Sequence, residues 1–254
     1  MSGLEASHPF TSELTIDELL LLEDVGFEPL ELLLGASYFH IGYQTSSFSQ
    51  NQELLDMSQM MLLARQTAMA EIRAQAQALG ADGVVGMRLE IEREGHHAEF
   101  AALGTAVRRR AGDGTKYRDR HGRPFTCDLS GADFWGLLRG GFRPLALVHG
   151  VCVYHVAHQS LRGWFSSIGN NCEMPAFTQA LYDARELAIS RAQHEAQSAG
   201  ASGGIVGLEL REGNHGWHSH VLELVAVGTA VSALTEPEHE QHTAARAVLS
   251  MRDA

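Results

Sequence analysis

The strongest constraint on the fold of this 254-residue chain is an internal repeat. The segment 14–44 aligns with the segment 129–159 at a constant offset of 115 residues, without a gap. Two later matches continue the repeat, Ala64-Arg65 with Ala184-Arg185 and Gly104–Val107 with Gly228–Val231. A repeat of this length indicates two copies of one domain of about 100 residues. Features shared by both copies therefore indicate fold, and features of a single copy are candidates for function.

Each copy is predicted to begin with a short helix followed by a long strand. The capping-box pattern Thr15-Ile16-Asp17-Glu18 starts the first short helix, and its counterpart begins at Ser130. Runs rich in Leu, Val and Tyr, Leu30–Tyr43 and Leu145–Ala157, predict the strands. Gly35 and Gly150 interrupt both strands at the same place, which indicates a bulge or a close backbone approach.

A long helix and two further strands complete each copy. Apolar residues recur every three or four positions up to Gly80 in the first copy and up to Gly200 in the second, which predicts the helices. The strands expected next are Val84–Arg93 and Ala98–Arg108, then Ile205–Arg211 and Trp217–Ala233. The predicted class is α+β, with a three-stranded β-α-β-β sheet in each copy. Because so small a sheet leaves its edges unpaired, self-assembly is expected.

The domain boundaries follow from the repeat. We expect an N-terminal tail at 1–11, a first domain at 12–110, a polar linker at 111–126, a second domain at 127–234 and a C-terminal tail at 235–254. The linker carries the one basic stretch of the chain and is expected to be solvated. The C-terminal tail could include a short helix.

Composition limits the classes of function. Apolar residues make up 44% of the chain and charged residues 20%, which suits two compact domains. The formal net charge of −12 disfavours nucleic-acid binding, because phosphate contacts need a positive surface. We expect no signal peptide in Met1–Glu13 and no membrane insertion. Three cysteines without CxxC spacing argue against a disulfide framework, so the expected compartment is a reducing cytoplasm.

Two glycine-rich strings resemble the YbjQ family, often called heavy-metal-binding domains. They are Gly80–Gly86 and Gly104–Val107, and the second copy carries a looser version at Gly200–Gly207. The resemblance covers roughly 29–107 and 144–231. It implies dodecin-like subunits that assemble into pentameric rings, sometimes stacked. The family's Gly-Gly-Arg-Ser segment before the helix is missing from both copies, so no function of that segment carries over to this chain.

The densest histidine group predicts a candidate metal site in the second copy. His218 and His220 would share one face of a strand and could chelate a divalent metal such as zinc, with His215 or Glu212 as a third ligand. The alternative is an exposed polar hairpin. A second group is divided by strand alternation, which places His149 with His155 and puts Cys152 and His158 on the other face.

Four charged residues are matched between the copies and are candidates for subunit contacts. Glu99 aligns with Glu223 on the last strand, and Arg65 aligns with Arg185 on the long helix. A buried pair between such residues would set the register of an interface rather than perform catalysis.

Three functions are therefore considered, with copies of the chain itself as the expected partner. The first is a non-catalytic, self-assembling homo-oligomeric ring or shell of pentamer type. The second is a module that binds heavy metals or small ligands. The third is an enzyme whose site forms between subunits, although no catalytic motif is present.

Overall fold

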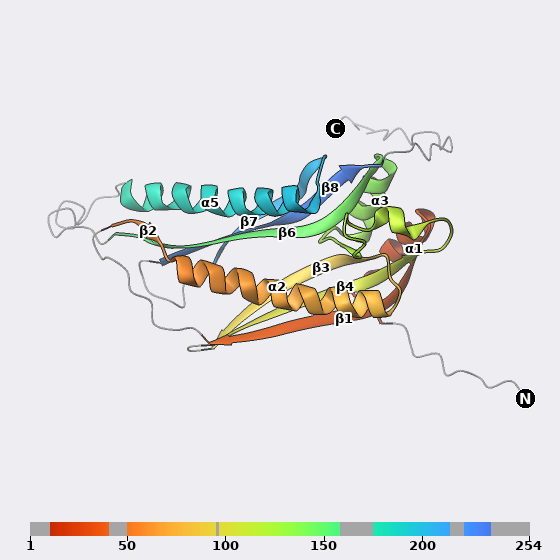
Figure 1. The fold of residues 1–254 in the computed structure, drawn as a ribbon, viewed down its shortest axis with the longest axis horizontal. Helices are drawn as coiled ribbons and strands as arrows, with labels where there is room; N and C mark the ends of the chain where they lie inside the picture. Colours follow the sequence, from red (N-terminus) through yellow and green to blue (C-terminus); the bar gives the residue numbers. More distant parts are fainter. Residues whose placement is uncertain (1–10, 41–49, 95–96, 158–174, 214–220, 235–254) are drawn as a thin grey trace, which may run out of the picture.

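Two sheets and two long helices form four stacked layers in the computed structural model, which describes residues 11–40, 50–94, 97–157, 175–213 and 221–234. Sheet A has the strand order β1-β4-β3-β5, and sheet B has the order β2-β6-β8-β7. Figure 1 shows the layers in the order sheet A, α2, sheet B, α5. The elements are α1 (Ile16–Asp24), β1 (Phe27–His40), β2 (Gln52–Glu53), α2 (Leu55–Ala78), β3 (Gly83–Glu94), β4 (His97–Arg109), η1 (Gly114–Tyr117), β5 (Phe125–Thr126), α3 (Gly131–Arg139), β6 (Phe142–His155), α5 (Pro175–Ala199), β7 (Gly204–Gly213) and β8 (Val221–Ala233).

The predicted α+β class and the tandem β-α-β-β order are confirmed. The first copy comprises α1, β1, α2, β3 and β4, and the second comprises α3, β6, α5, β7 and β8. The capping box predicted at Thr15 and Glu18 is present at the start of α1. The predicted tails, 235–254 and all but Thr11 of 1–11, lie outside the described residues.

Each sheet has a fourth strand that the sequence did not predict. The two residues of β5 pair in parallel with β3, Gly83 opposite Phe125. The two residues of β2 precede the first long helix but pair with β6 of the second copy, Gln52 opposite His155. Strands of two residues are too short to show a period in the sequence. The pairing of β2 with β6 joins the two copies through backbone hydrogen bonds.

The segment 111–126 between the copies is packed in part: its end at 124–126 and the side chain of Tyr117 are buried, while 111–113 and 120–123 are exposed. The side chains of Tyr117 and Phe125 are buried with Phe27 and Phe134 in a cluster at the end of the molecule that carries α1 and α3. Phe27 meets Tyr117 edge to face at a centroid distance of 5.0 Å. The expectation of a solvated stretch is therefore wrong for Tyr117 and Phe125, whose aromatic rings are buried among exposed charged residues.

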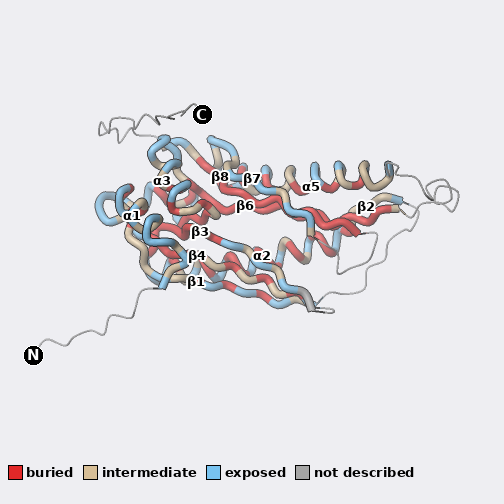
Figure 2. Tube along the Cα trace, turned by 180° about the vertical axis from the view of Figure 1, so that it is seen from behind, coloured by how far each residue is buried: buried red, intermediate tan, exposed pale blue. Residues whose placement is uncertain are grey.

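The strands of the two sheets differ in how deeply they are buried. β1 alternates between buried and exposed residues over its second half, which leaves one face of sheet A open. β6 and β8 are buried on both faces almost throughout, because α5 covers one side of sheet B and α2 the other. Figure 2 shows this contrast, with β6 and β8 nearly all buried and β1 mixed. Sheet B is thus an inner layer, and sheet A is an outer one.

The close approach predicted at the two strand glycines is confirmed. A Cβ atom added at Gly35 would collide with the carbonyl oxygen of Ala68 in α2. One added at Gly150 would collide with the carbonyl oxygen of Ala188 in α5. The long helix of each copy therefore touches the backbone of its first strand, and alanines on the helix permit this contact.

Replacement of Gly150 by alanine should destabilise the protein by about 1–3 kcal/mol, because the helix backbone must move away from the new methyl group. The matched control is Gly136→Ala on the exposed side of α3, where a new Cβ would meet nothing within 4 Å. That change should stabilise by about 0.5–1 kcal/mol, because alanine is the better helix former. Chemical denaturation measures both, and equal stabilities of the two variants would contradict the close approach.

Candidate assembly surface and the pocket between the copies

The outer edge of β6 is capped by side chains rather than by a neighbouring strand until it meets β2. The caps come from α2, α5 and the segment before α3, and they satisfy backbone groups on alternate residues of the strand. The bonds are Leu147 N to Thr126 Oγ1 at 3.0 Å, Arg65 Nη2 to Leu147 O at 2.6 Å, His149 N to Glu195 Oε2 at 2.8 Å, Arg191 Nη1 to Val151 O, and Val153 N to Ser58 Oγ at 2.9 Å. An unpaired strand edge is a site for further pairing, so these bonds close it.

Arg65 is one of the residues that join the two copies. Its side chain is 3% exposed, and its Nη1 atom lies 2.9 Å from both carboxylate oxygens of Glu195. Its Nη2 atom donates to the Leu147 carbonyl. One arginine of the first copy therefore binds a helix and a strand of the second. The Glu195 side chain is 33% exposed, so water partly screens the pair, and removing one partner should cost less than the roughly 3–5 kcal/mol typical of a fully buried pair.

The four predicted contact residues lie in different places. Arg65 is buried between the copies, and its partner is Glu195, an acid that the repeat did not highlight because Gln75 stands at the matching position. Glu223 is buried in β8 opposite Val153. Arg185 is exposed on α5, across sheet B from Glu223. Glu99 is half-buried on the open face of sheet A. Pairing of these residues between subunits stays a prediction.

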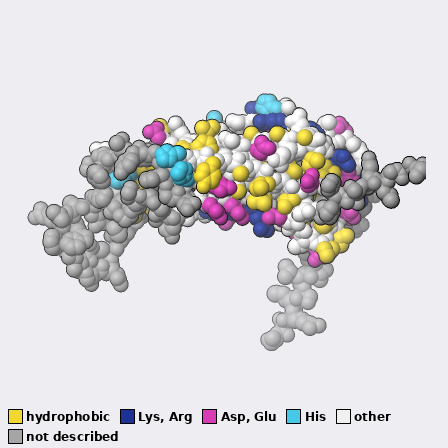
Figure 3. Space-filling view, turned by 90° about the horizontal axis from the view of Figure 1, so that it is seen from below, with side chains coloured by type: hydrophobic (Ala, Val, Ile, Leu, Met, Phe, Trp, Pro, Cys, Tyr) yellow, Lys and Arg dark blue, Asp and Glu magenta, His cyan; other side chains and the backbone are white. Residues whose placement is uncertain are grey.

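The open face of sheet A carries exposed apolar side chains. Leu34 is 53% exposed and Tyr38 is 62% exposed, both on β1. Figure 3 looks onto this side of the molecule, where hydrophobic and acidic side chains intermingle and histidines gather toward one end. At that end the rings of His40 and His97 lie 5.2 Å apart. The matching face of sheet B is covered, and Val153 at the position of Tyr38 is fully buried.

His149 is a buried imidazole next to the arginine that joins the copies. It is 2% exposed, and its Nδ1 atom has no hydrogen-bond partner. Burial holds the pKa of His149 well below its usual range, and the charges of Arg65 and Arg211 lower the pKa further. The first copy has Leu34 at the same strand position, where the side chain is 53% exposed.

His149→Leu should make the stability of the protein less sensitive to acid. Below the ordinary histidine pKa of 6.5 the imidazole of His149 is protonated in the unfolded chain but stays neutral in the folded chain. His149 therefore lowers the free energy of unfolding by up to about 1.4 kcal/mol for each pH unit as the pH falls. The free energy of unfolding, measured from pH 7.5 to pH 5, should therefore fall less steeply in the variant. His194→Leu, on the exposed side of α5, controls for the loss of an imidazole. An unchanged slope in His149→Leu would contradict this account.

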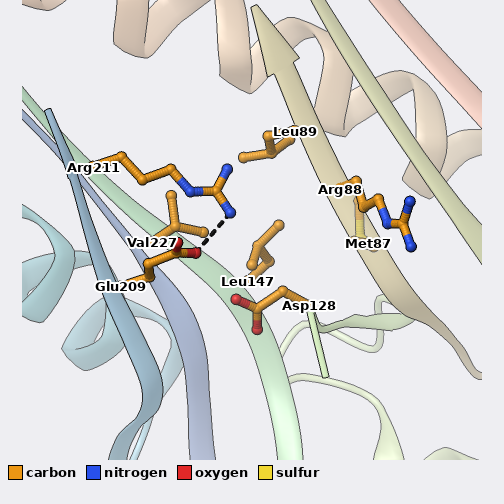
Figure 4. A pocket seen from close by; sticks show the side chains of 8 residues that line it. All are labelled: Met87, Arg88, Leu89, Asp128, Leu147, Glu209, Arg211 and Val227. Atoms are coloured by element: carbon orange, nitrogen blue, oxygen red, sulfur yellow. Dashed lines mark hydrogen bonds and ion pairs between the residues drawn. The ribbon is translucent and has the colours of Figure 1, made fainter. Parts of the chain in front are cut away.

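A pocket of about 280 Å³ lies between the two sheets (Figure 4). Its lining comprises Met87, Arg88, Leu89, Asp128, Leu147, Glu209, Arg211 and Val227. Arg211 donates to Glu209 at 2.7 Å, and burial raises the pKa of Asp128 although the Thr229 hydroxyl donates to it. The lining pairs no serine, cysteine, threonine or lysine with a base, so it lacks an activated nucleophile of that kind. Nothing in the repeat pointed to Asp128 or Glu209.

The described residues do not form a metal site. No group of three or more His, Cys, Asp or Glu side chains lies together within these parts of the chain. Cys127 and Cys152 are free but buried, and burial raises the pKa of the Cys152 thiol to about 12, which disfavours the thiolate that binds metals. The predicted ligands His215, His218 and His220 lie outside the described residues. The predicted separation of Cys152 from His149 and His155 on opposite faces of β6 is confirmed.

Comparison with known proteins agrees with the repeat and with the fold. A relative from Mycobacterium tuberculosis, named "Encapsulin nanocompartment protein Rv1762c", is 46% identical over 229 residues, which cover 89% of this chain and 87% of that protein. None of the helices in the described ranges is long and apolar enough to cross a membrane. The YbjQ family, described as "Putative heavy-metal-binding", matches residues 50–110 and 145–234. The chain therefore belongs to the YbjQ family and carries the family's domain in two tandem copies.

Proposed function

We propose that this chain is a non-catalytic protein that assembles with copies of itself into a closed ring or shell. The observation that carries the proposal is the 46% identity, over most of both chains, with a protein named as an encapsulin nanocompartment protein. That relationship supports a role for this chain in such a compartment, and we assign it the assembling one. Its expected partners are further copies of itself, and with a net charge of −12 nucleic acid is not among them.

The open surface of sheet A supports the proposal on physical grounds. β1 is a 14-residue strand at the edge of sheet A, and it exposes Leu34 and Tyr38. Long unprotected edges with apolar side chains are sites where proteins associate. The matching edge in sheet B is capped by five side-chain bonds. The chain covers the edge of β6 with its own side chains, and a second molecule could cover the similar edge of β1.

The pocket between the copies and the free cysteines support the rest of the proposal. The pocket lining lacks a paired nucleophile and base, in keeping with a structural role. Cys127 and Cys152 are free thiols, in keeping with a reducing cytoplasm. The resemblance to ring-forming relatives makes a pentamer, or a multiple of it, the assembly we expect.

Native mass spectrometry of the purified full-length chain at micromolar concentration tests this function. The expected result is a single closed homo-oligomer whose mass is five times 27.6 kDa or a multiple of that. Light scattering at several concentrations should give the same mass, because a closed particle does not grow. A stable monomer of 27.6 kDa would overturn the proposal.

The family description favours metal binding as a second candidate function. We assign it to His215, His218 and His220, which lie outside the described residues. The described residues themselves contain no group of three or more ligands. The His218→Ala/His220→Ala variant should then lose divalent-metal binding while its oligomer persists. Zinc titration of untagged protein measures the first effect, and light scattering measures the second. Zinc stoichiometry equal to that of the unaltered chain would exclude the site.

A further inference from the structure

The two copies share their internal geometry residue by residue. Leu32 pairs with Thr105 in sheet A as Leu147 pairs with Thr229 in sheet B. Tyr38 pairs with Glu99 in the first copy, and Val153 pairs with Glu223 in the second. The long helices approach Gly35 and Gly150 through Ala68 and Ala188 in the same way. A contact that one copy makes can therefore be transferred to the other by position.

One contact within the chain lacks its counterpart. The side of α2 that carries Ser58 and Arg65 docks on the outer edge of β6, where Ser58 accepts from Val153 N and Arg65 donates to Leu147 O. The matching residues on α5 are Thr178 and Arg185. Both lie on the second copy, and the described part of the chain contains no further copy for them to contact.

The matching side of α5 is uncovered. Tyr182 is 59% exposed. Arg185 is exposed, and none of the described residues forms an ion pair or hydrogen bond with it. Its counterpart Arg65 is almost completely buried, so the same residue type at the same place is satisfied in one copy and exposed in the other.

The matching edge of sheet A is capped less completely than the edge of β6. Leu34 and Tyr38 of β1 are exposed, whereas their counterparts His149 and Val153 are buried. Gln75 of α2 occupies the place of Glu195. It donates to the Leu34 carbonyl at 2.9 Å, while Glu195 accepts from the amide of His149. In the first copy, α2 therefore places the polar side chain of Gln75 where α5 of the second copy places Glu195, the partner of Arg65.

Charge on this side of α2 is complementary to Arg185. The Gln75 amide also donates to Glu71 at 3.0 Å, and Glu71 is exposed. A guanidinium placed here as Arg65 is placed against Glu195 would meet the Gln75 oxygen and, one turn away, the Glu71 carboxylate. Because Gln75 stands where the second copy has the carboxylate of Glu195, the contact of Arg185 should be weaker than that of Arg65.

We propose that α5 of one chain docks on sheet A of the next chain in the way that α2 docks on sheet B within a chain. In this contact Arg185 donates to the Leu32 carbonyl and to Gln75, with Glu71 as its counter-ion, and the Thr178 hydroxyl accepts from the amide of Tyr38. The occupant of the open face is thus a second copy of this chain. The inference rests on the proposed self-assembly and names the surface that produces it.

This contact is heterologous, because the two chains contribute different surfaces. Such contacts join subunits head to tail and form rings when the rotation closes. The strand edge and the apolar face of sheet A, which are open in a single chain, are then covered in every chain of the ring.

Arg185→Glu tests the proposed contact by native mass spectrometry of the full-length chain. Because Arg185 is exposed, the variant should keep its fold, which circular dichroism checks. Its oligomer should dissociate at concentrations on the order of thirtyfold higher than that of the unaltered chain, the loss expected for an interface arginine. Arg139→Glu, the same charge change on the exposed side of α3, should leave the oligomer intact.

A charge exchange tests the partner residue. Glu71→Arg added to Arg185→Glu should restore part of the oligomer, because the reversed charges attract again. An Arg185→Glu chain that assembles as the unaltered chain does would overturn the contact and leave the proposed assembly standing. A monomeric unaltered chain would instead remove the assembly itself. A double variant no better than the single one would overturn the assignment of Glu71.

Discussion

The arrangement of the molecule depends on the docking of α2 on the edge of β6. Arg65 and Ser58 turn that edge from an open strand into a closed one, and Glu195 completes the set from α5. The same docking buries β6 and β8 of sheet B on both faces, while the edge strand β7 stays largely exposed. Without it the two copies would be separate domains, each with an open sheet. With it the two long strands of sheet B are covered, whereas β1 of sheet A still exposes one face.

The asymmetry of a tandem repeat then has a functional consequence. The α2 helix of the first copy packs against β6 of the second, but the described residues include no further copy against which α5 could pack in the same way. A single chain therefore leaves two surfaces exposed, the side of α5 that carries Arg185 and the outer edge of β1. Head-to-tail assembly requires two different surfaces on each chain, one of which binds the other on the next chain.

Much of the fold could be predicted from the sequence. The spacing of apolar residues marks each helix and strand, and the repeat gives the same order of elements twice. The long helices, the strands and the close approach at Gly35 and Gly150 follow from residues near each other in the chain. The fourth strands could not be predicted, since two residues carry no period. The partner of Arg65 was also missed, because Glu195 lies 130 residues away and has no carboxylate at its matching position. The second buried side of α2 was missed because Ser58 and Arg65 make it look polar.

The most direct test of this account is the structure of the assembled particle by electron cryomicroscopy. The account predicts that α5 of one chain lies along β1 of the next, with Arg185 beside Gln75 and the side chains of Leu34 and Tyr38 buried between chains. A particle in which sheet A faces solvent, with the chains joined through other surfaces, would contradict it.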